Sequence, residues 1–381
     1  MFEEILKIIY LLALGQGVLV AMVLMFSRAP SAANTPEQTA PKPVTSVEHK
    51  ILFFYILAMM LPLWEGYISL APDALKPLSI PYLFWLLPWL YGPLLYLYVK
   101  AKCRKDFKLT KSDGKHFTIL LFPILVLSTL DSLQQSIPLL VIQRLSWALV
   151  FSQMFTYIGF CFSEINRYQK LLANNYSYLE QRNISWLKKL LVGFVLIFLL
   201  DMGVYYLKAF LELRAQWYFH TFVIVESLYV VLIGFFSFRH PSVDPNSLVE
   251  PNPKYEKSSL DPHVAKRLAQ RIVELMEHEA WYLQNDLTLQ NLAERLNVSS
   301  HHLSQVINDQ LNMTFYELVN EKRISAAKAL LAEEPQARTI LDIGYEVGFN
   351  NKTSFNNAFK KFTGMTPSEY RRQSSQIANL R

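Results

Sequence analysis

The feature that most constrains this chain is a helical pattern that occurs twice, 51 residues apart. Residues 289–296 carry apolar or small side chains at positions i, i+3, i+4 and i+7, which places them on one face of a helix. Residues 340–347 repeat this spacing, with a small residue at the same third place. A threonine that can cap the helix precedes each repeat, at Thr288 and Thr339.

A second apolar helix is expected after each repeat. In the first copy Ser299 is a candidate N-cap, and in the second copy residues 348–350 make the turn before the candidate cap Asn351. The sequence therefore predicts two helix-turn-helix units, at about 288–311 and 339–363.

A linker helix is predicted between the two units, from Thr314 to Leu331. Thr314 and Glu317 fit a capping box at its start. As a helix this segment would be about 26 Å long. Such a helix can hold two reading helices in successive major grooves, which lie about 34 Å apart on one face of DNA.

Four stretches of this region match one family pattern: LQNLAERL (289–296), RISAAKALL (323–331), ILDIGYEVGF (340–349) and SFNNAFKKFTGMTPSEY (354–370). They resemble the DNA-binding domain of the AraC/XylS family of bacterial transcription regulators. The resemblance covers about residues 271–372 and implies a sequence-specific DNA-binding role. Two positions depart from the family pattern, because Asn312 stands where Gly is usual and Gly344 where Ala is usual.

The residues expected to meet DNA lie on the outward faces of the second helix of each unit. The resemblance implies that base edges are read by His301, Ser304, Gln305, Thr353, Asn356 and Asn357. Asn and Gln can make paired hydrogen bonds to adenine, which suits this role. Phosphate contacts are expected from Ser300, Lys352, Lys360, Lys361, Arg371 and Arg372. The alternative is that these side chains form only a solvated surface.

Charge predicts weak binding by one isolated domain. From residue 263 onward, 14 Lys and Arg face 13 Asp and Glu, and six of the basic residues lie beyond residue 350 with one acid. Phosphate attraction should therefore be concentrated on the second unit and be sensitive to salt. We expect the active form to be a homodimer or to use paired sites.

The first 239 residues are predicted to be a transmembrane sensor domain of seven helices, with six or eight as the error range. The chain is 52% hydrophobic and only 18% charged, which favours a membrane protein. Each span is a long apolar run; they are 5–26, 51–70, 80–99, 117–133, 139–162, 186–207 and 219–238. A signal peptide is the alternative for the first run, but Glu3 and Glu4 replace the expected positive charges and the run is too long.

Loop charge predicts the orientation. Basic residues crowd the loop at 100–115, the start of span six and the end of span seven, whereas the opposite loops hold few. The positive-inside rule then places the N-terminus outside and the C-terminal domain in the cytoplasm of a bacterial inner membrane. The basic loop has a second reading, as a site for anionic lipid.

Polar residues within the spans are the only sequence clue to a signal. Burying a carboxylate in hydrocarbon is costly, so such groups usually face a cavity or a partner. We expect a pocket for an unknown small-molecule or envelope signal, lined by Glu65, Asp201, Glu226, Gln16 and Gln153. The alternative is that these side chains reach the nearby membrane surface or bond neighbouring helices.

A Pro-rich linker is predicted at 240–262, followed by an amphipathic helix at 263–283 that belongs to the DNA-binding domain, a dimer contact, or both. Cys103 and Cys161 have no metal or redox spacing, and His301 and His302 lack partners for a metal site. No cofactor and no enzymatic site is expected. The favoured function is a membrane-bound transcription regulator, and the alternative is a transporter or membrane enzyme with a helical regulatory module.

Overall fold

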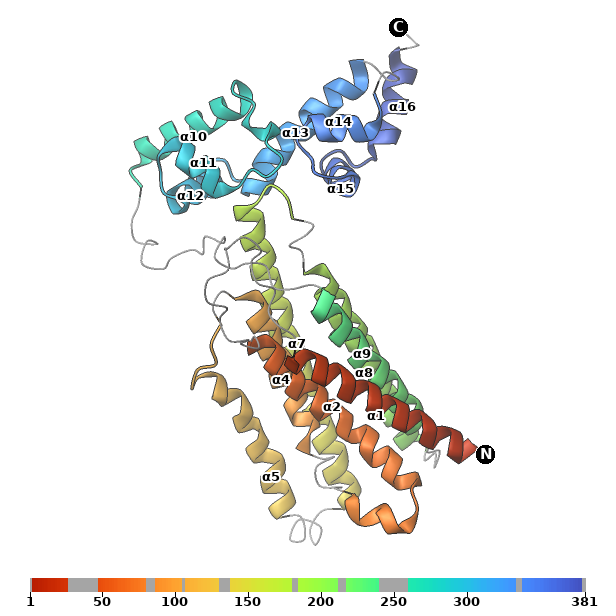
Figure 1. The fold of residues 1–381 in the computed structure, drawn as a ribbon. Coiled ribbons are helices and arrows are strands. Elements are labelled where there is room, and N and C mark those ends of the chain that lie inside the picture. The colour runs from red at the N-terminus through yellow and green to blue at the C-terminus, as the bar shows by residue number, and fades with distance from the viewer. Residues whose placement is uncertain are drawn as a thin grey trace, which may run out of the picture. The chain divides into compact units, whose positions relative to one another are not determined.

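The chain separates into two compact units. The computed structural model describes residues 2–26, 47–79, 86–104, 107–129, 138–179, 184–211, 217–239, 260–333 and 338–378. Unit 1 holds Met1–Asn166 and Ile184–Pro245, and unit 2 holds Arg167–Asn183 and Asn246–Arg381 (Figure 1). Within the described ranges the regular elements are helices, and the extended pairing is a single bridge between Tyr176 and Thr288. The all-α prediction is confirmed.

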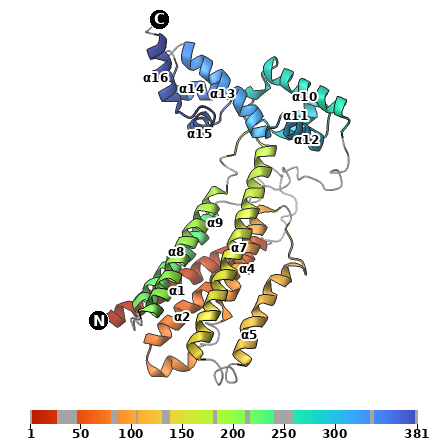
Figure 2. The ribbon, with the colours of Figure 1, turned by 180° about the vertical axis from the view of Figure 1, so that it is seen from behind.

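Unit 1 is a set of helices that lie side by side in both views (Figures 1 and 2). They are α1 (Phe2–Phe26), α2 (Val47–Leu70), α4 (Pro88–Cys103), α5 (Leu121–Ser128), α7 (Leu139–Asn175), α8 (Ser185–Phe210) and α9 (Trp217–Arg239), with 3₁₀ turns η1 (Asp73–Leu78) and η2 (Asp113–Leu120). The last residues of α7, from Arg167 on, belong to unit 2. Helix α2 packs against α1, α4 and α9, which makes it central to the unit.

Three helices are long and apolar enough to cross a membrane within the described residues. They cover Glu3–Phe26, Val47–Leu70 and Arg144–Asn175, and a shorter apolar helix covers Ile224–Ser237. Each of the seven predicted spans overlaps a helical segment, but the count of seven stays a prediction.

The fourth predicted span differs most from expectation. Its first part is the 3₁₀ turn η2, and α5 begins only at Leu121, so that Pro123 lies in the first turn, where its missing N–H costs no helical bond. Residues 80–85 of the third span and 130–133 of the fourth lie outside the described residues, as does the linker at 240–259.

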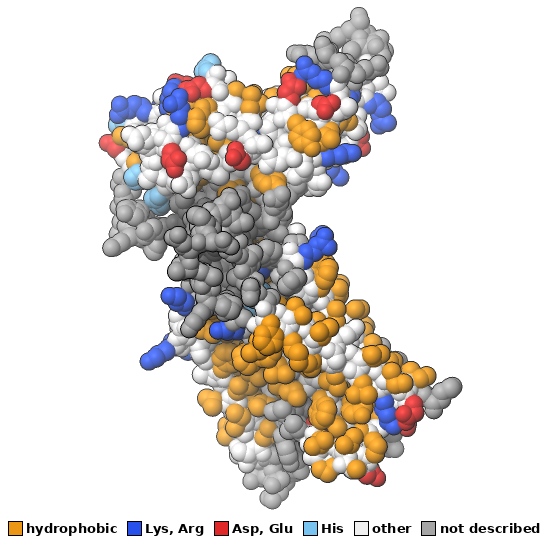
Figure 3. Space-filling view, in the orientation of Figure 1, with side chains coloured by type: hydrophobic (Ala, Val, Ile, Leu, Met, Phe, Trp, Pro, Cys, Tyr) orange, Lys and Arg blue, Asp and Glu red, His pale blue; other side chains and the backbone are white. Residues whose placement is uncertain are grey.

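The outer surface of unit 1 is apolar. Helix α1 exposes large side chains along its whole length, including Ile8, Leu12, Leu19 and Phe26, and α8 exposes Leu200. Figure 3 shows hydrophobic side chains over much of the visible face of this unit. In water such a surface would be unfavourable, since monomeric soluble proteins rarely expose apolar patches beyond a few hundred Å².

Unit 2 has two hydrophobic cores that share one helix, α13 (Phe315–Glu333). The first core joins Phe315, Leu318 and Val319 of α13 to α10 (Pro262–Glu277), α11 (Leu289–Leu296) and α12 (Ser300–Gln310). The second core joins Ile324, Ala327 and Leu331 of the same helix to α14 (Ile340–Glu346), α15 (Lys352–Thr363) and Tyr370 of α16 (Pro367–Ala378). We call α13 the strut, because each of its halves carries one helix-turn-helix unit.

Side-chain caps define most helix starts in unit 2. Thr288 accepts a hydrogen bond from the N–H of Asn291, and Thr339 accepts one from Asp342, each within a capping box. Ser299 and Asn351 cap α12 and α15 as predicted. Thr314 and Glu317 also exchange the predicted pair of bonds at the start of the strut, which is worth about 1 kcal/mol for a typical cap.

The helix predicted at 263–283 is shorter than expected. Helix α10 ends at Glu277, and Ala280 adopts the left-handed conformation with φ 49°, which an α-helix cannot continue through. A separate 3₁₀ turn, η5 (Trp281–Leu283), follows it.

Candidate nucleic-acid interface

Helices α12 and α15 are the second helices of the two helix-turn-helix units. Each buries an apolar face, with Leu303, Val306 and Ile307 on α12 and Phe355, Ala358 and Phe359 on α15. The opposite face of each helix is therefore the one left for a partner. With 19 residues, the strut is about 28 Å long, which is of the order needed to serve successive major grooves.

The six predicted base-reading residues lie on the outward or half-buried side of these helices. Thr353 and Asn357 are exposed, and His301, Ser304, Gln305 and Asn356 are half-buried. Gln305 has its amide oxygen enclosed without a hydrogen-bond partner among the described residues. Asn308 donates its amide to Ser304, so it stabilises α12 from its own surface.

The predicted phosphate contacts differ in how available they are. Lys352, Lys360 and Arg372 are exposed, and none makes an ion pair among the described residues. Lys361 is held by the carboxylate of Glu317 at 3.2 Å and lies over the ring of Tyr316 at 5.0 Å. Ser300 is half-buried at the start of α12, and Arg371 has two guanidinium nitrogens enclosed.

Ion pairs reduce the positive potential of the first helix-turn-helix unit and its surroundings. Arg271 and Arg295 both bind Glu279, and Lys322 binds Glu277 at 2.7 Å. Lys352 and Lys360 of the second unit lie outside these pairs, but so do the exposed Lys266 and Arg267 of α10.

The departure at Gly344 has a steric reason. A Cβ at this position would lie 2.9 Å from the ring of Phe355, closer than real contacts allow. Glycine thus lets α14 approach α15 within the second unit, and this offsets its poor helix propensity. Asn312 adopts φ 54°, the left-handed conformation expected where Gly is usual.

One side chain that the sequence did not single out connects the two halves of the DNA-binding domain. Arg323 of the strut is 1% exposed, and it donates to the carbonyl oxygens of Tyr282 and Gln284 while its guanidinium lies 5.5 Å over the ring of Phe349. Burial lowers the pKa of Arg323 to about 10, so the group stays charged at neutral pH. It was visible in the sequence only as part of a matching stretch.

Two helix-turn-helix units on one strut, each with a polar outward face, define a double helix-turn-helix DNA-binding domain. A family model described as "Helix-turn-helix domain" matches residues 292–373. The C-terminal domain is thus a helix-turn-helix domain of the AraC type, as the resemblance implied.

Relatives match about a third of this chain, and the chain covers well under two thirds of their own length. The uncharacterized HTH-type transcriptional regulator YtdP of Bacillus subtilis (strain 168) is 32% identical over 108 residues, 28% of this chain and 13% of that protein. The melibiose operon regulatory protein of Escherichia coli (strain K12) is 26% identical over 129 residues, 34% of this chain and 41% of that protein. Both are regulators rather than enzymes.

A solved structure is also similar in sequence. It is the C-terminal domain of AraT, a response regulator from Geobacillus stearothermophilus, at 35% identity, covering 30% of this chain and 87% of that chain with a TM-score of 0.25.

The five residues predicted for a signal pocket do not come together as one set. Glu226 lines a cavity in unit 1 together with Met59, Tyr91, Phe194, Ile197, Phe198 and Tyr229. Asp201 lies near enough to interact electrostatically with Glu226. Gln16 is exposed on α1, Glu65 accepts a hydrogen bond from Ser79, and Gln153 donates to the carbonyl oxygen of Trp89.

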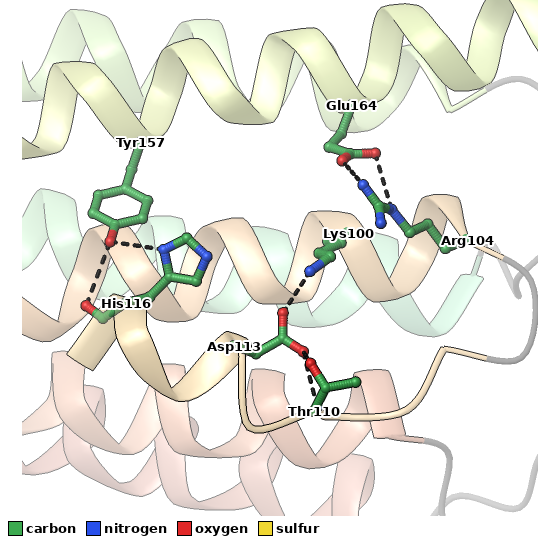
Figure 4. Close-up of polar contacts among 7 residues, drawn as sticks. All are labelled: Lys100, Arg104, Thr110, Asp113, His116, Tyr157 and Glu164. Atoms are coloured by element: carbon green, nitrogen blue, oxygen red, sulfur yellow. Dashed lines mark hydrogen bonds and ion pairs between the residues drawn. The ribbon is translucent and has the colours of Figure 1, made fainter. Parts of the chain in front are cut away.

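A polar layer marks one end of unit 1 (Figure 4). Lys100 near the end of α4 binds Asp113 at the start of η2, and Arg104 binds Glu164 of α7. Lys102 also reaches Glu48 in the first turn of α2, at 3.3 Å. These contacts bring together helix ends that loop charge had assigned to the same side of the membrane.

The carboxyl of Asp113 is tightly held in this layer. Burial raises its pKa, but hydrogen bonds from Lys100 and from Thr110 outweigh this and hold the pKa at about 2. His116 bonds the hydroxyl of Tyr157 at 3.1 Å, and burial lowers the pKa of this histidine (Figure 4).

Proposed function

We propose that this protein is a membrane-embedded transcription regulator that binds double-stranded DNA and responds to a signal through unit 1. One observation carries the proposal above the others. The same chain joins an AraC-type helix-turn-helix domain to a helical unit whose large apolar side chains face outward. Such a surface suits a lipid bilayer, because exposed apolar side chains are not in contact with water there.

DNA is bound through the outward faces of α12 and α15. His301, Ser304 and Gln305 read one major groove, and Thr353, Asn356 and Asn357 read the next. Lys352, Lys360 and Arg372 make the first phosphate contacts, since they are exposed and none is held in an ion pair among the described residues. Lys361 joins them only after it leaves Glu317.

A homodimer is the active form in this proposal. The first unit has few uncompensated cations, so a single domain binds weakly. Two domains on adjacent sites raise the overall affinity through their effective concentration, and confinement to a membrane favours the encounter.

The polar layer lies at the cytoplasmic surface of a bacterial inner membrane. Lys100, Lys102 and Arg104 are at this end, and α9 ends with Arg239. The positive-inside rule then leaves the N-terminus outside and the DNA-binding domain in the cytoplasm.

The signal enters the cavity that Glu226 lines. Its other lining residues are apolar or tyrosine. Both Glu226 Oε2 and Tyr91 Oη are enclosed and lack a hydrogen-bond partner among the described residues. Buried polar atoms without partners are costly, so the cavity fits a small apolar molecule that carries a hydroxyl or an ammonium group.

The DNA-binding part is tested with the full chain in native membrane vesicles incubated with sheared genomic DNA. The expected result is recovery of fragments that share a motif made of two parts about one helical turn, or 34 Å, apart. Recovery of DNA without any shared motif would contradict the proposal. So would a tag after Arg381 that protease reaches only from outside the cell.

The cavity is tested with a reporter fused to a recovered promoter. Glu226→Gln and Tyr91→Phe should change reporter output at equal protein level in the membrane, because the first replaces a carboxylate oxygen by an amide NH₂ group and the second removes the hydroxyl. Glu65→Gln is the matched control, since Glu65 already bonds Ser79 outside the cavity. Wild-type output from all three variants would remove the cavity from the mechanism.

A further inference from the structure

A short segment from outside the C-terminal domain docks onto it. Tyr176 and Ser177 directly follow helix α7 and belong to unit 2. Tyr176 forms an antiparallel bridge with Thr288, and both the N–H and the hydroxyl of Ser177 donate to the carbonyl oxygen of Leu287, the hydroxyl at 2.7 Å. Both residues are only 2% exposed, so the contact is closely packed and excludes solvent.

The strut holds the other side of this segment. The amide of Asn320 donates to the carbonyl oxygen of Ser177 at 2.8 Å, and Asn320 is fully buried. Its second bond goes to the carbonyl of Tyr316, one turn earlier in the same helix. The bond to Ser177 is therefore the contact that joins the strut to this segment.

The segment contacts the connection that leads into the first helix-turn-helix unit. We call residues 281–288 the strap, since they join α10 to α11. Leu287 and Thr288 of the strap contact Tyr176 and Ser177.

At its other end the strap meets the second unit. Arg323 binds the strap carbonyls of Tyr282 and Gln284 and covers the ring of Phe349. A Cβ on Gly348 would lie only 2.7 Å from the strap carbonyl oxygen of Leu283. The strap thus contacts both the segment after α7 and the turn of the second unit.

We propose that docking of Tyr176–Ser177 on the strap sets the spacing of α12 and α15, so that helix α7 controls DNA affinity. The docked state is the binding-competent one, because a strap held at both ends pre-organises the two reading helices and lowers the ordering cost of binding. The control over affinity rests on the proposed DNA-binding function, whereas the docking does not.

Asn320→Leu is the principal test. Leucine has a similar size, and the change also removes the amide oxygen of Asn320, which is buried without a partner among the described residues. The strut should therefore keep its stability while losing its bond to Ser177. Ser177→Pro removes both donors to Leu287 from the segment itself, and Ser177→Thr, which keeps them, is the control.

The experiment uses full-length protein in nanodiscs and two DNA probes. One is a duplex selected from a random 30-base-pair pool by the wild type, and the other is the same duplex with one of its two half-sites scrambled. Hydrogen exchange of residues 168–179 and 281–291 reports docking. Both disruptive variants should exchange faster there and bind the two-half-site duplex at least tenfold more weakly, with single-half-site affinity within twofold of wild type.

Three results would overturn the inference. The first is faster exchange in the disruptive variants with unchanged affinity for DNA. The second is an equal loss of affinity for both duplexes. The third is exchange of these residues in the wild type that is already as fast as in the variants. Failure of the wild type to enrich any duplex would instead count against the proposed function, and the exchange data would still decide whether the segment docks.

Discussion

Gly348 and Gly364 offer a matched pair of substitutions in the second helix-turn-helix unit. Both residues have positive φ, 94° and 78°, so alanine at either position is strained. They differ in their surroundings, because a Cβ at Gly348 would lie 2.7 and 2.9 Å from two strap carbonyl oxygens, whereas nothing lies within 4 Å at Gly364. The pair therefore separates backbone strain from steric conflict with the strap.

The expected magnitudes follow from these two terms. Left-handed backbone costs an alanine about 1–2 kcal/mol, and this applies to both Gly348→Ala and Gly364→Ala. Forcing a carbon into a packed site adds about 1–3 kcal/mol at Gly348, because the opposing atoms are backbone oxygens and cannot rotate away. Gly348→Ala should thus destabilise the unit by about 2–5 kcal/mol, and Gly364→Ala by about 1–2 kcal/mol.

Hydrogen exchange of the full-length protein in nanodiscs measures both effects. Local opening free energies translate into exchange rates at about tenfold per 1.4 kcal/mol, so Gly348→Ala should accelerate exchange in α14 and α15 well beyond the control. It should also accelerate exchange in the strap, which Gly364→Ala leaves unchanged. Equal effects of the two substitutions, or an unaffected strap in both, would refute the reasoning.

Four further outcomes are expected. Thr288→Ala should lower the unfolding free energy by about 1 kcal/mol in chemical denaturation, and Thr288→Ser should restore it. Lys360→Ala should weaken binding alike on all DNA sequences and reduce the salt slope by about 0.9, whereas the ion-paired Lys322→Ala should leave that slope unchanged. Asn356→Ala should cost about 1–3 kcal/mol of discrimination at one base pair, measured by competition between duplexes. The pKa of Asp113 in the folded protein, about 2, lies below its ordinary value of 3.8, so the carboxylate stabilises the fold above about pH 4 and this stabilisation is lost as the pH falls through 2. The difference in melting temperature between the wild type and Asp113→Asn should therefore shrink from pH 5 to pH 3.

Local signals in the sequence predicted the C-terminal domain well. The caps at Thr288, Ser299 and Asn351 could be read because a cap depends on residues three positions apart. The end of α10 could not, because the left-handed conformation of Ala280 depends on the packing of the turn that follows, and alanine carries no signal for it.

Contacts between distant residues were beyond the sequence. Ser177 and Asn320 are 143 positions apart, and no periodicity connects them. For the same reason the sequence did not reveal that Arg323 is buried. In unit 1 the polar residues of the spans were identified by type, but which of them face the cavity depends on helix rotation, and only Glu226 of the five lines it.

Because α13 contributes side chains to both cores, the number of residues in α13 sets the rotation of α15 relative to α12 about the axis of the strut. Each residue of a helix turns the chain by about 100° and advances it by about 1.5 Å. One alanine inserted between Val319 and Ile324 would rotate α15 to a different side of the duplex while each core kept its own residues. Seven inserted residues would nearly restore the phase and lengthen the reach by about 10 Å. The length of one helix thus encodes which operator geometry this domain accepts.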